Sequence, residues 1–472
     1  MQRYSTSTGN QTQVGAHAID RLEERLRGAL IRSDDRRYDS ARRVYNAMID
    51  RHPLLIVECA DTADVTECLR FSRDNSIPLS VRGGGHSGPG LGVCDDGIVI
   101  DLSQMNGVRV DPAARTARVE GGCTWADVDH ATHAFGLATV SGVVSTTGVG
   151  GLTLGGGHGH LTRKYGLTID NLISADVILA DGRFVTASTR ENADLFWAIR
   201  GGGGNFGVVT SFLFELHPVD TVNAGLMVWP LEQADRVIRW YRDFIPGAPE
   251  ELNGFFAMMS VPPIPLFPNA LHNQIVGGIV WCYCGPPEGA DAAMAPTRTV
   301  DPAPVFEHVG PMPYPKLQSL FDPLLPPGLQ WYWKGNFYRE LTDDCIAEHI
   351  KWAAQFPTAL STIHLYPIDG AVHRVGKNDT AFSYRDCQFS EVVGGVDPDP
   401  ANKDRITNWS RDAWNALQPY SAGGAYVNFM MEEGIDRVRA TYRDNFDRLE
   451  RVKAKYDPGN VFRSSQNIPP AQ

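Results

Sequence analysis

The strongest constraint on the fold of this chain is a run of three glycines at residues 83–85, set between two apolar segments that we predict to be strands. The loop reads VRGGGHSG over residues 81–88. Because glycine has no Cβ, successive amides can turn inward and closely approach an anion such as a pyrophosphate. The hydroxyl of Ser87 can add a further donor. The sequence therefore predicts an anion-binding loop with the imidazole of His86 in its middle.

Two matches to the dinucleotide fingerprint GxGxxG argue against a Rossmann fold rather than for it. The fingerprint requires a strand before it and a helix directly after it. The match at residues 83, 85 and 88 is followed by Pro89, Gly90 and another predicted strand. The match at residues 202, 204 and 207 follows a predicted helix and precedes a strand (residues 208–216). A nicotinamide-dependent enzyme, which would be colourless, is therefore a disfavoured alternative.

A second glycine-rich segment spans residues 141–159, with eight glycines in nineteen positions. Such a composition predicts neither a stable helix nor a long regular strand. We interpret it as a second backbone cradle that approaches the same ligand from the other side.

Composition narrows the class of protein. The chain has 472 residues, 43% hydrophobic and 21% charged, which predicts a globular protein of two domains. A net charge of −12 without a basic stripe argues against nucleic acid as a partner. No apolar run suits a membrane span, and the polar N-terminus (residues 1–16) lacks a secretory pattern, so we expect a cytoplasmic protein. Eight cysteines without a framework spacing indicate reduced thiols, and Cys282 and Cys284 suit packing better than metal binding.

The organisation along the chain predicts three segments. Residues 1–218 carry a charged helix at 17–31, a βαβ-like unit at 54–81 and short strands with glycine turns. Residues 219–424 are rich in proline and aromatics and are predicted to cover a substrate. Residues 425–472 are predicted to form a strand at 425–430 and a long helix at 435–456, and to return to the first domain.

Four motifs, in order along most of the chain, resemble the berberine bridge enzyme-like branch of the vanillyl-alcohol oxidase/PCMH flavoprotein superfamily. They are RGGGHS at 82–87, GGGHGHLTRKYGLTIDN at 155–171, LFWAIRGGGGNFGVVT at 195–210 and AKYDPGNVFRSSQNIPP at 454–470. The resemblance implies an α+β fold: a PCMH-type FAD-binding domain of two α/β subdomains, and a substrate domain with an antiparallel sheet covered by helices. The first domain and the C-terminal segment would hold FAD.

The resemblance also implies how the flavin is attached. His86 matches the residue that bonds the flavin 8α-methyl carbon, and Val144 stands where many relatives have a second, cysteine attachment, so we expect a single covalent link through His86. Such a bond fixes the ring and raises its reduction potential. The alternative is that His86 is a turn residue that only hydrogen-bonds. The predicted cofactor-binding residues are Arg82, Gly83, Gly84, Gly85, His86, Ser87, Gly88, Val143, Ser145, Thr146, Gly148, Gly151, Gly155, Gly156, Gly159, Gly204, Gly207, Val209, Tyr426, Asn428, Asn460 and Gln466.

Oxidation of an alcohol or amine by flavin usually needs a base for the heteroatom proton. Relatives often place a tyrosine base where this chain has Phe429, which excludes a phenolate there. Alternation along a predicted strand at 382–393 puts Glu391 on one face with Arg385, and Glu391 is our candidate base, since desolvation beside a flavin would raise its pKa. A surface glutamate or an ion pair with Arg385 is the nearly equal alternative. His158 is the second candidate, because relatives often carry an aromatic residue facing the substrate there; a metal site at His158 and His160 is disfavoured.

The predicted activity is oxidation of a small organic molecule, a carbohydrate or secondary metabolite, with dioxygen as electron acceptor and hydrogen peroxide as product. The small side chain of Val143 favours an oxidase, because the resemblance implies that a small side chain at this position leaves room for dioxygen. A dehydrogenase with another acceptor, and a flavin-binding protein without turnover, are the alternatives. Six aromatic residues are predicted as pocket walls or core: Tyr283, Trp331, Trp333, Tyr338, His364 and Tyr366.

Overall fold

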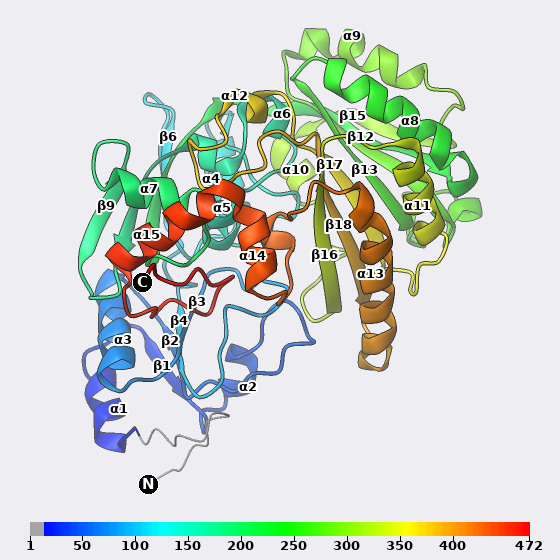
Figure 1. Ribbon diagram of the computed structural model, residues 1–472. Coiled ribbons are helices and arrows are strands. Elements are labelled where there is room, and N and C mark those ends of the chain that lie inside the picture. The colour runs from blue at the N-terminus through cyan, green and yellow to red at the C-terminus, as the bar shows by residue number, and fades with distance from the viewer. Residues whose placement is uncertain (1–13) are drawn as a thin grey trace.

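A four-stranded sheet forms the N-terminal part of the computed structural model, which describes residues 14–472 (Figure 1). The sheet order is β1-β2-β4-β3, with β2 and β3 both parallel to β4 and β1 antiparallel to β2. The predicted βαβ unit is present, because α3 (Thr62–Asp74) connects β2 to β3 and buries Val65, Cys68 and Leu69. Asp61 caps α3 by accepting from two of its first amides. The strands are β1 (Ala29–Arg32), β2 (Leu55–Glu58), β3 (Leu79–Arg82) and β4 (Ile98–Asp101).

The predicted N-terminal helix is shorter than expected. Helix α1 (Ala16–Glu23) ends early, and residues 29–32 form β1 instead. The amides of Arg27 and Gly28 both donate to the Asp64 carboxylate at 2.8 Å, which redirects the chain onto the sheet edge. The charged pattern continued through 31, but this tertiary contact overrides it. The predicted polar N-terminus lies mostly outside the described residues.

A five-stranded antiparallel sheet follows, in the order β5-β6-β10-β8-β9. The turn at Asp181-Gly182 joins β8 to β9. Helix α4 (Trp125–His133) starts with a capping box in which Thr124 and Asp127 satisfy each other's amides. Together with α7 (Ala193–Ile199) it encloses the core of this part. The strands are β5 (Val108–Asp111), β6 (Thr116–Glu120), β8 (Leu172–Ile178), β9 (Phe184–Ser188) and β10 (Val208–Glu215), with a small pair β7 (Leu137–Ala138) and β11 (His217–Pro218).

The glycine-rich segment at 141–159 contains a helix, contrary to the prediction. Gly148 is the N-cap of helix α5 (Val149–Gly155), and α6 (Thr162–Tyr165) lies shortly after it. Leu152 and Leu154 of α5 pack against the core of the five-stranded sheet. Tertiary burial of these two side chains outweighs the low helix propensity of glycine.

A seven-stranded antiparallel sheet dominates residues 221–397, in the order β15-β12-β14-β13-β17-β18-β16. Figure 1 shows α8, α11 and α13 along one face of this sheet. The predicted antiparallel sheet with covering helices is therefore confirmed. The strands are β12 (Thr221–Pro230), β13 (Leu252–Ser260), β14 (Ile275–Tyr283), β15 (Phe306–Pro313), β16 (Gln330–Tyr338), β17 (Thr362–Pro367) and β18 (Phe389–Asp397). The helices are α8 (Ala234–Phe244), α9 (Ala290–Met294), α10 (Tyr314–Gln318), α11 (Asp343–Ala353), α12 (Ala371–Arg374) and α13 (Lys403–Leu417).

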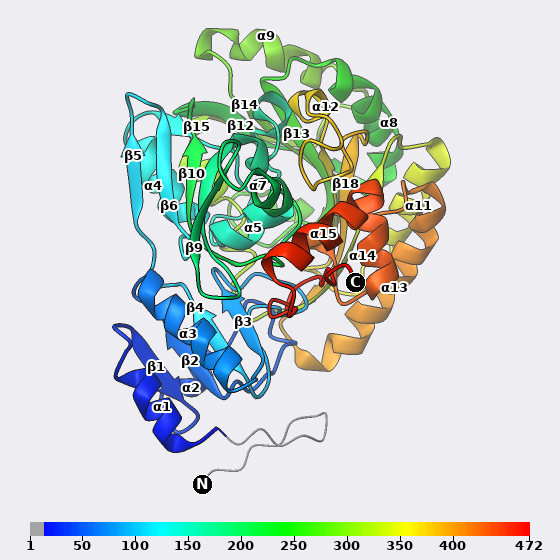
Figure 2. The ribbon, with the colours of Figure 1, turned by 60° about the vertical axis from the view of Figure 1, so that its left-hand side comes forward.

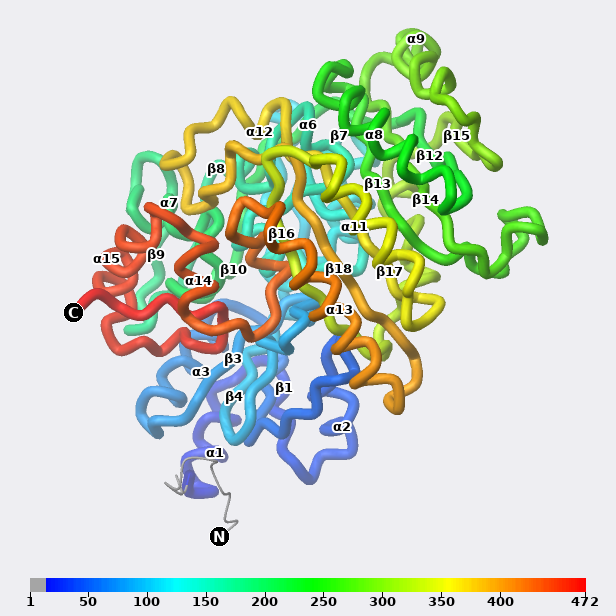
Figure 3. The backbone as a smooth tube through the Cα atoms, turned by 45° about the vertical axis from the view of Figure 1, so that its right-hand side comes forward, coloured from blue at the N-terminus to red at the C-terminus, as the bar shows by residue number. Residues whose placement is uncertain are grey.

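The C-terminal segment packs against the core of the five-stranded sheet, and its local structure differs from the predicted strand and long helix. Within residues 425–430 the chain forms a turn of 3₁₀ helix (Val427–Phe429) rather than a strand. The long helix is broken into α14 (Ile435–Tyr442) and α15 (Phe446–Tyr456). Arg443, between them, has a left-handed φ of 47°, which interrupts the helix. Figures 2 and 3 show α15 beside α7 and the extended tail against the N-terminal layer.

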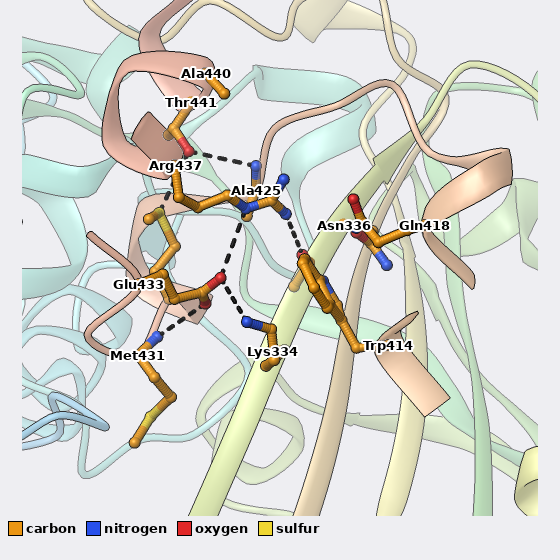
Figure 4. A network of polar contacts seen from close by, with 12 residues as sticks. Lys334, Asn336, Trp414, Gln418, Ala425, Met431, Glu433, Arg437, Ala440 and Thr441 are labelled. Carbon is orange, nitrogen blue, oxygen red and sulfur yellow. Dashed lines mark hydrogen bonds and ion pairs between the residues drawn. The ribbon is translucent and has the colours of Figure 1, made fainter. Parts of the chain in front are cut away.

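A polar cluster ties this segment to the seven-stranded sheet (Figure 4). Lys334 of β16 donates to Glu433 at 2.7 Å and lies 3.8 Å from the centroid of the Trp414 ring of α13. Arg437 of α14 donates to the backbone oxygen of Gly335. Glu433 and Lys334 are both buried, so their charges are compensated by each other rather than by water.

Among residues 14–472, no helix combines the length and apolar character that crossing a lipid bilayer requires. All eight cysteines are buried and unpaired. Cys282 lies inside β14 and Cys284 just beyond it, both packed in an apolar cluster with Phe255 and Tyr314. Their role in the structure is packing.

Candidate active site

A cavity of about 390 Å³ lies where the two glycine-rich segments, the C-terminal segment and the seven-stranded sheet meet. This volume is in the range of about 300–1,000 Å³ typical of small-molecule sites. The backbone of residues 83–87 and residues of 142–154 form one side. The cavity face of β16, β17 and β18 forms the other, with Trp331, Trp333, His364 and Tyr366 among its walls. Of the six aromatic walls predicted, Tyr283 and Tyr338 are instead buried away from the cavity, in the core of the seven-stranded sheet.

His86 lies in the wall of this cavity and is held from three sides. Its ring stacks on Tyr45 at 4.0 Å between centroids. Its Nε2 is 3.1 Å from the Thr146 hydroxyl, and its Nδ1 is 3.5 Å from the Thr147 hydroxyl. Burial lowers the pKa of His86 to about 4, so the imidazole is neutral at pH 7. A neutral imidazole fixed in this way has a lone pair available to a ligand.

Arg82, at the end of β3, anchors the first glycine loop. Its guanidinium donates to the Asp101 carboxylate of β4 at 2.5 Å, and both side chains are buried. The ion pair locks the end of β3 against its parallel neighbour. The glycines that follow are therefore presented to the cavity by a rigid sheet edge.

The two glycine loops touch each other through their backbones. A Cβ placed on Gly84 would lie 2.4 Å from the amide nitrogen of Gly148, and one on Gly148 would lie 2.2 Å from that of Gly84. No side chain fits at this contact. The sequence singled out both loops for a different reason, anion binding, but their mutual contact also requires glycine.

Most of the predicted cofactor-binding residues line the cavity. They are Arg82, Gly83, Gly84, Gly85, His86, Ser87, Val143, Gly148, Gly151, Gly204, Gly207, Val209, Tyr426, Asn428 and Gln466. Val144, at the predicted vacant attachment position, also lines it.

The remaining predicted residues are not among those that line the cavity. A Cβ at Gly88 would meet the Trp333 ring, and Ser145 donates to the Asp322 carboxylate. Thr146 reaches the site only through the His86 ring. Asn460 lies in the turn after α15, where its amide donates to the Asp457 carbonyl. Three predicted glycines pack closely against other residues. A Cβ would meet the Asn428 side chain at Gly155, the Phe382 ring at Gly156 and the Ser141 carbonyl at Gly159.

His158, the second predicted catalytic residue, lines the cavity. Its Nε2 is 3.2 Å from the Ser390 hydroxyl of β18, and its ring packs 4.6 Å from Tyr426 and 5.0 Å from Tyr366. Burial lowers the pKa of His158 to about 3, so it is a neutral hydrogen-bonding group at pH 7. His160 contacts Phe255 instead. Among residues 14–472 there is no cluster of three or more groups that could hold a metal.

Glu391 does not face the cavity, which corrects its prediction as the base. The strand begins at Phe389, so alternation cannot be counted from residue 382, and Arg385 pairs with Asp170 rather than with Glu391. Val392 and Gly394 line the cavity, which turns Glu391 to the opposite, helix-covered face. There it is fully buried and accepts from Tyr338 and Asn336 at 2.8 Å.

His349 of α11 completes this buried cluster. Its Nε2 is 2.6 Å from Glu391, and its Nδ1 is 2.7 Å from the carbonyl of Cys345. Although burial disfavours a charged imidazole, the Glu391 carboxylate more than offsets this and raises the pKa of His349 well above its ordinary value. The cluster is a structural ion pair on the back of the sheet.

Some wall residues have no signal in the sequence. Tyr45, Phe321 and Leu325 come from connections far from any motif, yet all three line the cavity. Val392 lies one residue from the predicted base. Tyr45 and Leu325 are joined by a hydrogen bond from the Tyr45 hydroxyl to the Leu325 carbonyl at 2.7 Å, a contact between distant parts of the chain that the sequence does not reveal.

Fold and site together define a flavin-dependent oxidoreductase. A family model described as FAD binding domain matches residues 53–188, and one described as Berberine and berberine like matches residues 425–469. An FAD-linked oxidoreductase of Dictyostelium discoideum is 32% identical over 98% of this chain and 99% of its own length. The chain belongs to the berberine bridge enzyme-like family of FAD-linked oxidoreductases. The predicted family, α+β fold and enzyme class are confirmed.

Solved structures agree with the fold. The 6-hydroxy-D-nicotine oxidase of Arthrobacter nicotinovorans superposes with a TM-score of 0.85, at 25% identity, over 94% of this chain and 98% of that one. A chitooligosaccharide oxidase superposes with a TM-score of 0.81, at 22% identity, over 96% of this chain and all of the other. The second likeness shows the fold alone.

The residues present fit FAD. Successive backbone amides of the two glycine loops suit a pyrophosphate, and their contact at Gly84 and Gly148 leaves no room for side chains. The aromatic and apolar walls beyond His86 suit a planar ring and an organic substrate. The tail contributes Ser464, Ser465 and Gln466 to the same cavity.

Proposed function

We propose that this protein is an FAD-dependent oxidase whose flavin is bonded once, through His86. The observation that carries the proposal is the setting of His86: a neutral imidazole in the cavity wall, fixed by Tyr45 and two threonine hydroxyls. The lone pair on one ring nitrogen can bond a flavin methyl carbon. Val144 supports single attachment, because its side chain cannot form a second bond.

We propose that the substrate is an uncharged small molecule that carries a hydroxyl group. Among the cavity residues that the structure describes, Arg82 is the one with a permanent charge, and Asp101 already pairs with it. A cationic amine would enter a cavity without a carboxylate, which is unfavourable in a region of low dielectric. Neighbours named for a hydroxynicotine and for chitooligosaccharides support a small organic substrate in a fold of this kind.

The flavin, when bound, supplies the acceptor for a hydride from the carbon bearing the hydroxyl. The chain's own residues do the rest. The rings of His158, Tyr366 and Phe429 pack together in the cavity wall, where their aromatic surface would exclude water from a bound substrate. Val143, a small wall residue, supports access for dioxygen and hence release of hydrogen peroxide. A dehydrogenase with another electron acceptor is the alternative within the same site.

Acid precipitation of the purified protein tests the attachment. We expect yellow colour in the pellet and a flavin-sized mass on the peptide that contains His86. Colour in the supernatant would overturn covalent attachment. Anaerobic reduction with a panel of primary and benzylic alcohols, followed by mixing with aerated buffer, tests the activity. Reoxidation within seconds with peroxide release supports the oxidase, whereas a flavin that stays reduced until a quinone is added supports the dehydrogenase.

A further inference from the structure

We propose that Tyr366, backed by His364, accepts the proton of the substrate hydroxyl. Both lie on β17, two residues apart, so they share the face of the strand that lines the cavity. The Tyr366 hydroxyl is 2.7 Å from Nδ1 of His364. The inference rests on the proposed alcohol substrate and adds the residue that handles its proton.

The position of Tyr366 is fixed by its neighbours. Its ring packs 4.9 Å from Phe255, 5.0 Å from His158 and 6.0 Å from Phe429, measured between centroids. Phe429 has no hydroxyl. Tyr366 therefore brings a phenol to the part of the cavity that Phe429 leaves without one.

No carboxylate competes for this role. Glu391 is turned to the back of the sheet, and the neighbouring strand presents Val392 and Gly394 to the cavity. His158 is engaged with the Ser390 hydroxyl through Nε2. The Tyr366 and His364 pair brings to the cavity wall a phenol hydroxyl that is directly backed by an imidazole nitrogen.

The chemistry of the pair follows from its geometry. Burial lowers the pKa of His364 to about 4, so its imidazole is neutral at pH 7, and burial raises the pKa of the Tyr366 phenol. The raised pKa keeps the Tyr366 phenol protonated at pH 7, so its O–H can donate to the neutral imidazole, and its oxygen can take a further proton only as the phenol proton leaves. With the phenol proton pointing at Nδ1, a lone pair of the oxygen faces the cavity.

The proposed proton transfer balances. As the hydroxyl O–H bond of the substrate breaks, its proton bonds to the Tyr366 oxygen, and the phenol proton moves to Nδ1 of His364. The electron pair of the substrate C–H bond leaves with the hydride to the oxidant named above, and a carbonyl group forms. In this scheme Tyr366 is the catalytic residue, because it touches the substrate, and His364 is a positioning residue that acts through it.

An equilibrium measurement tests the contact without turnover. The purified holoprotein and the variants Tyr366→Phe and His364→Gln are first reduced anaerobically with dithionite, so that no alcohol can be oxidised. Each is then titrated calorimetrically with benzyl alcohol and with toluene, which lacks the hydroxyl. We expect Tyr366→Phe to weaken benzyl alcohol binding about 3–10-fold, the value of one hydrogen bond, and to leave toluene unchanged. Equal affinity of the wild type for the two probes, or no change in Tyr366→Phe, would overturn the proposal.

Anaerobic rapid mixing tests the proton transfer. With the best alcohol of the panel, we expect Tyr366→Phe to lower the limiting rate of flavin reduction by about 10²–10⁴, the range of general acid–base catalysis, with less than a tenfold change in substrate dissociation constant. His364→Gln should lower the same rate and leave benzyl alcohol binding intact. Reduction of both variants at the wild-type rate would overturn the proposal.

Matched controls remove the same groups elsewhere. Tyr332→Phe deletes a hydroxyl that contacts Arg411 on the opposite face of the sheet, and His308→Gln changes an exposed histidine on the edge strand β15. Both should behave as wild type. If the wild-type flavin is reduced by none of the alcohols, the proposed function fails, whereas the difference between benzyl alcohol and toluene still decides the role of Tyr366.

Discussion

Replacing Glu391 separates a structural from a catalytic role for the buried carboxylate. The side chain is fully buried and meets three donors: His349, Tyr338 and Asn336. Removing one partner of a buried ion pair costs about 3–5 kcal/mol, because the other charge is left without compensation. We therefore expect Glu391→Ala to lower the free energy of unfolding by about 3–5 kcal/mol.

Glu391→Gln should cost less, about 1–2 kcal/mol. The amide oxygen can still accept from Tyr338 and Asn336, and the amide nitrogen can donate to a neutral His349 whose Nδ1 proton points at the Cys345 carbonyl. The pair also predicts a pH dependence. Because the pKa of His349 is raised in the folded state, the stability it contributes is complete below its unfolded pKa of about 6.5 and is lost as pH rises through the folded value. Glu391→Gln should reduce the loss of folding stability with rising pH.

Urea unfolding followed by tryptophan fluorescence measures the stability of each variant, and Glu340→Ala, an exposed carboxylate nearby, serves as control. Anaerobic flavin reduction of folded Glu391→Gln should stay within about threefold of wild type, where a catalytic base would lose about 10²–10⁴. A Glu391→Ala variant as stable as wild type would refute the structural role. A collapse of flavin reduction in well-folded Glu391→Gln would refute its separation from the active site.

Three further perturbations follow from the structure. His86→Ala should release flavin to the supernatant on acid precipitation while the protein remains folded by circular dichroism; retained covalent colour would contradict the attachment. Gly84→Ala places a Cβ 2.4 Å from the Gly148 amide, so flavin content should fall and unfolding should become easier by about 1–3 kcal/mol, with Gly15→Ala, where nothing lies within 4 Å, as control. Burial raises the pKa of Asp129 to about 8, so its contribution to stability is complete below about pH 4 and is lost as pH rises towards 8. Asp129→Asn should therefore be more stable than wild type at pH 8.5 in urea unfolding, and an unchanged pH dependence would count against that shift.

The glycine loops were predictable because their role depends on the backbone, and glycine is the residue that allows close backbone approach. A loop such as residues 83–88 has few side chains, which indicates that a ligand or another part of the chain approaches its backbone closely. The structure has a cavity at this loop. The βαβ unit was predictable because its signals are local.

The catalytic side was not predictable from local patterns. Both faces of β18 are buried, one by helices and one by the cavity, so alternation alone could not tell which face carries Glu391. The pairing of β17 beside β18, which brings Tyr366 opposite Ser390, depends on strand order across the whole sheet. The break at Arg443 is likewise invisible, because a charged residue in a left-handed conformation has no sequence signature.

The tail that lines the cavity also sets an order of events during synthesis. Ser464, Ser465 and Gln466 reach the cavity, while Asn205 binds the amide of Ile468 and the buried Lys453 joins Asn205, Asp457 and Phe462. A ribosome has completed His86 and both glycine loops hundreds of residues before it reaches this point. The cavity wall is therefore incomplete until residues 464–466 have been made and have packed against it.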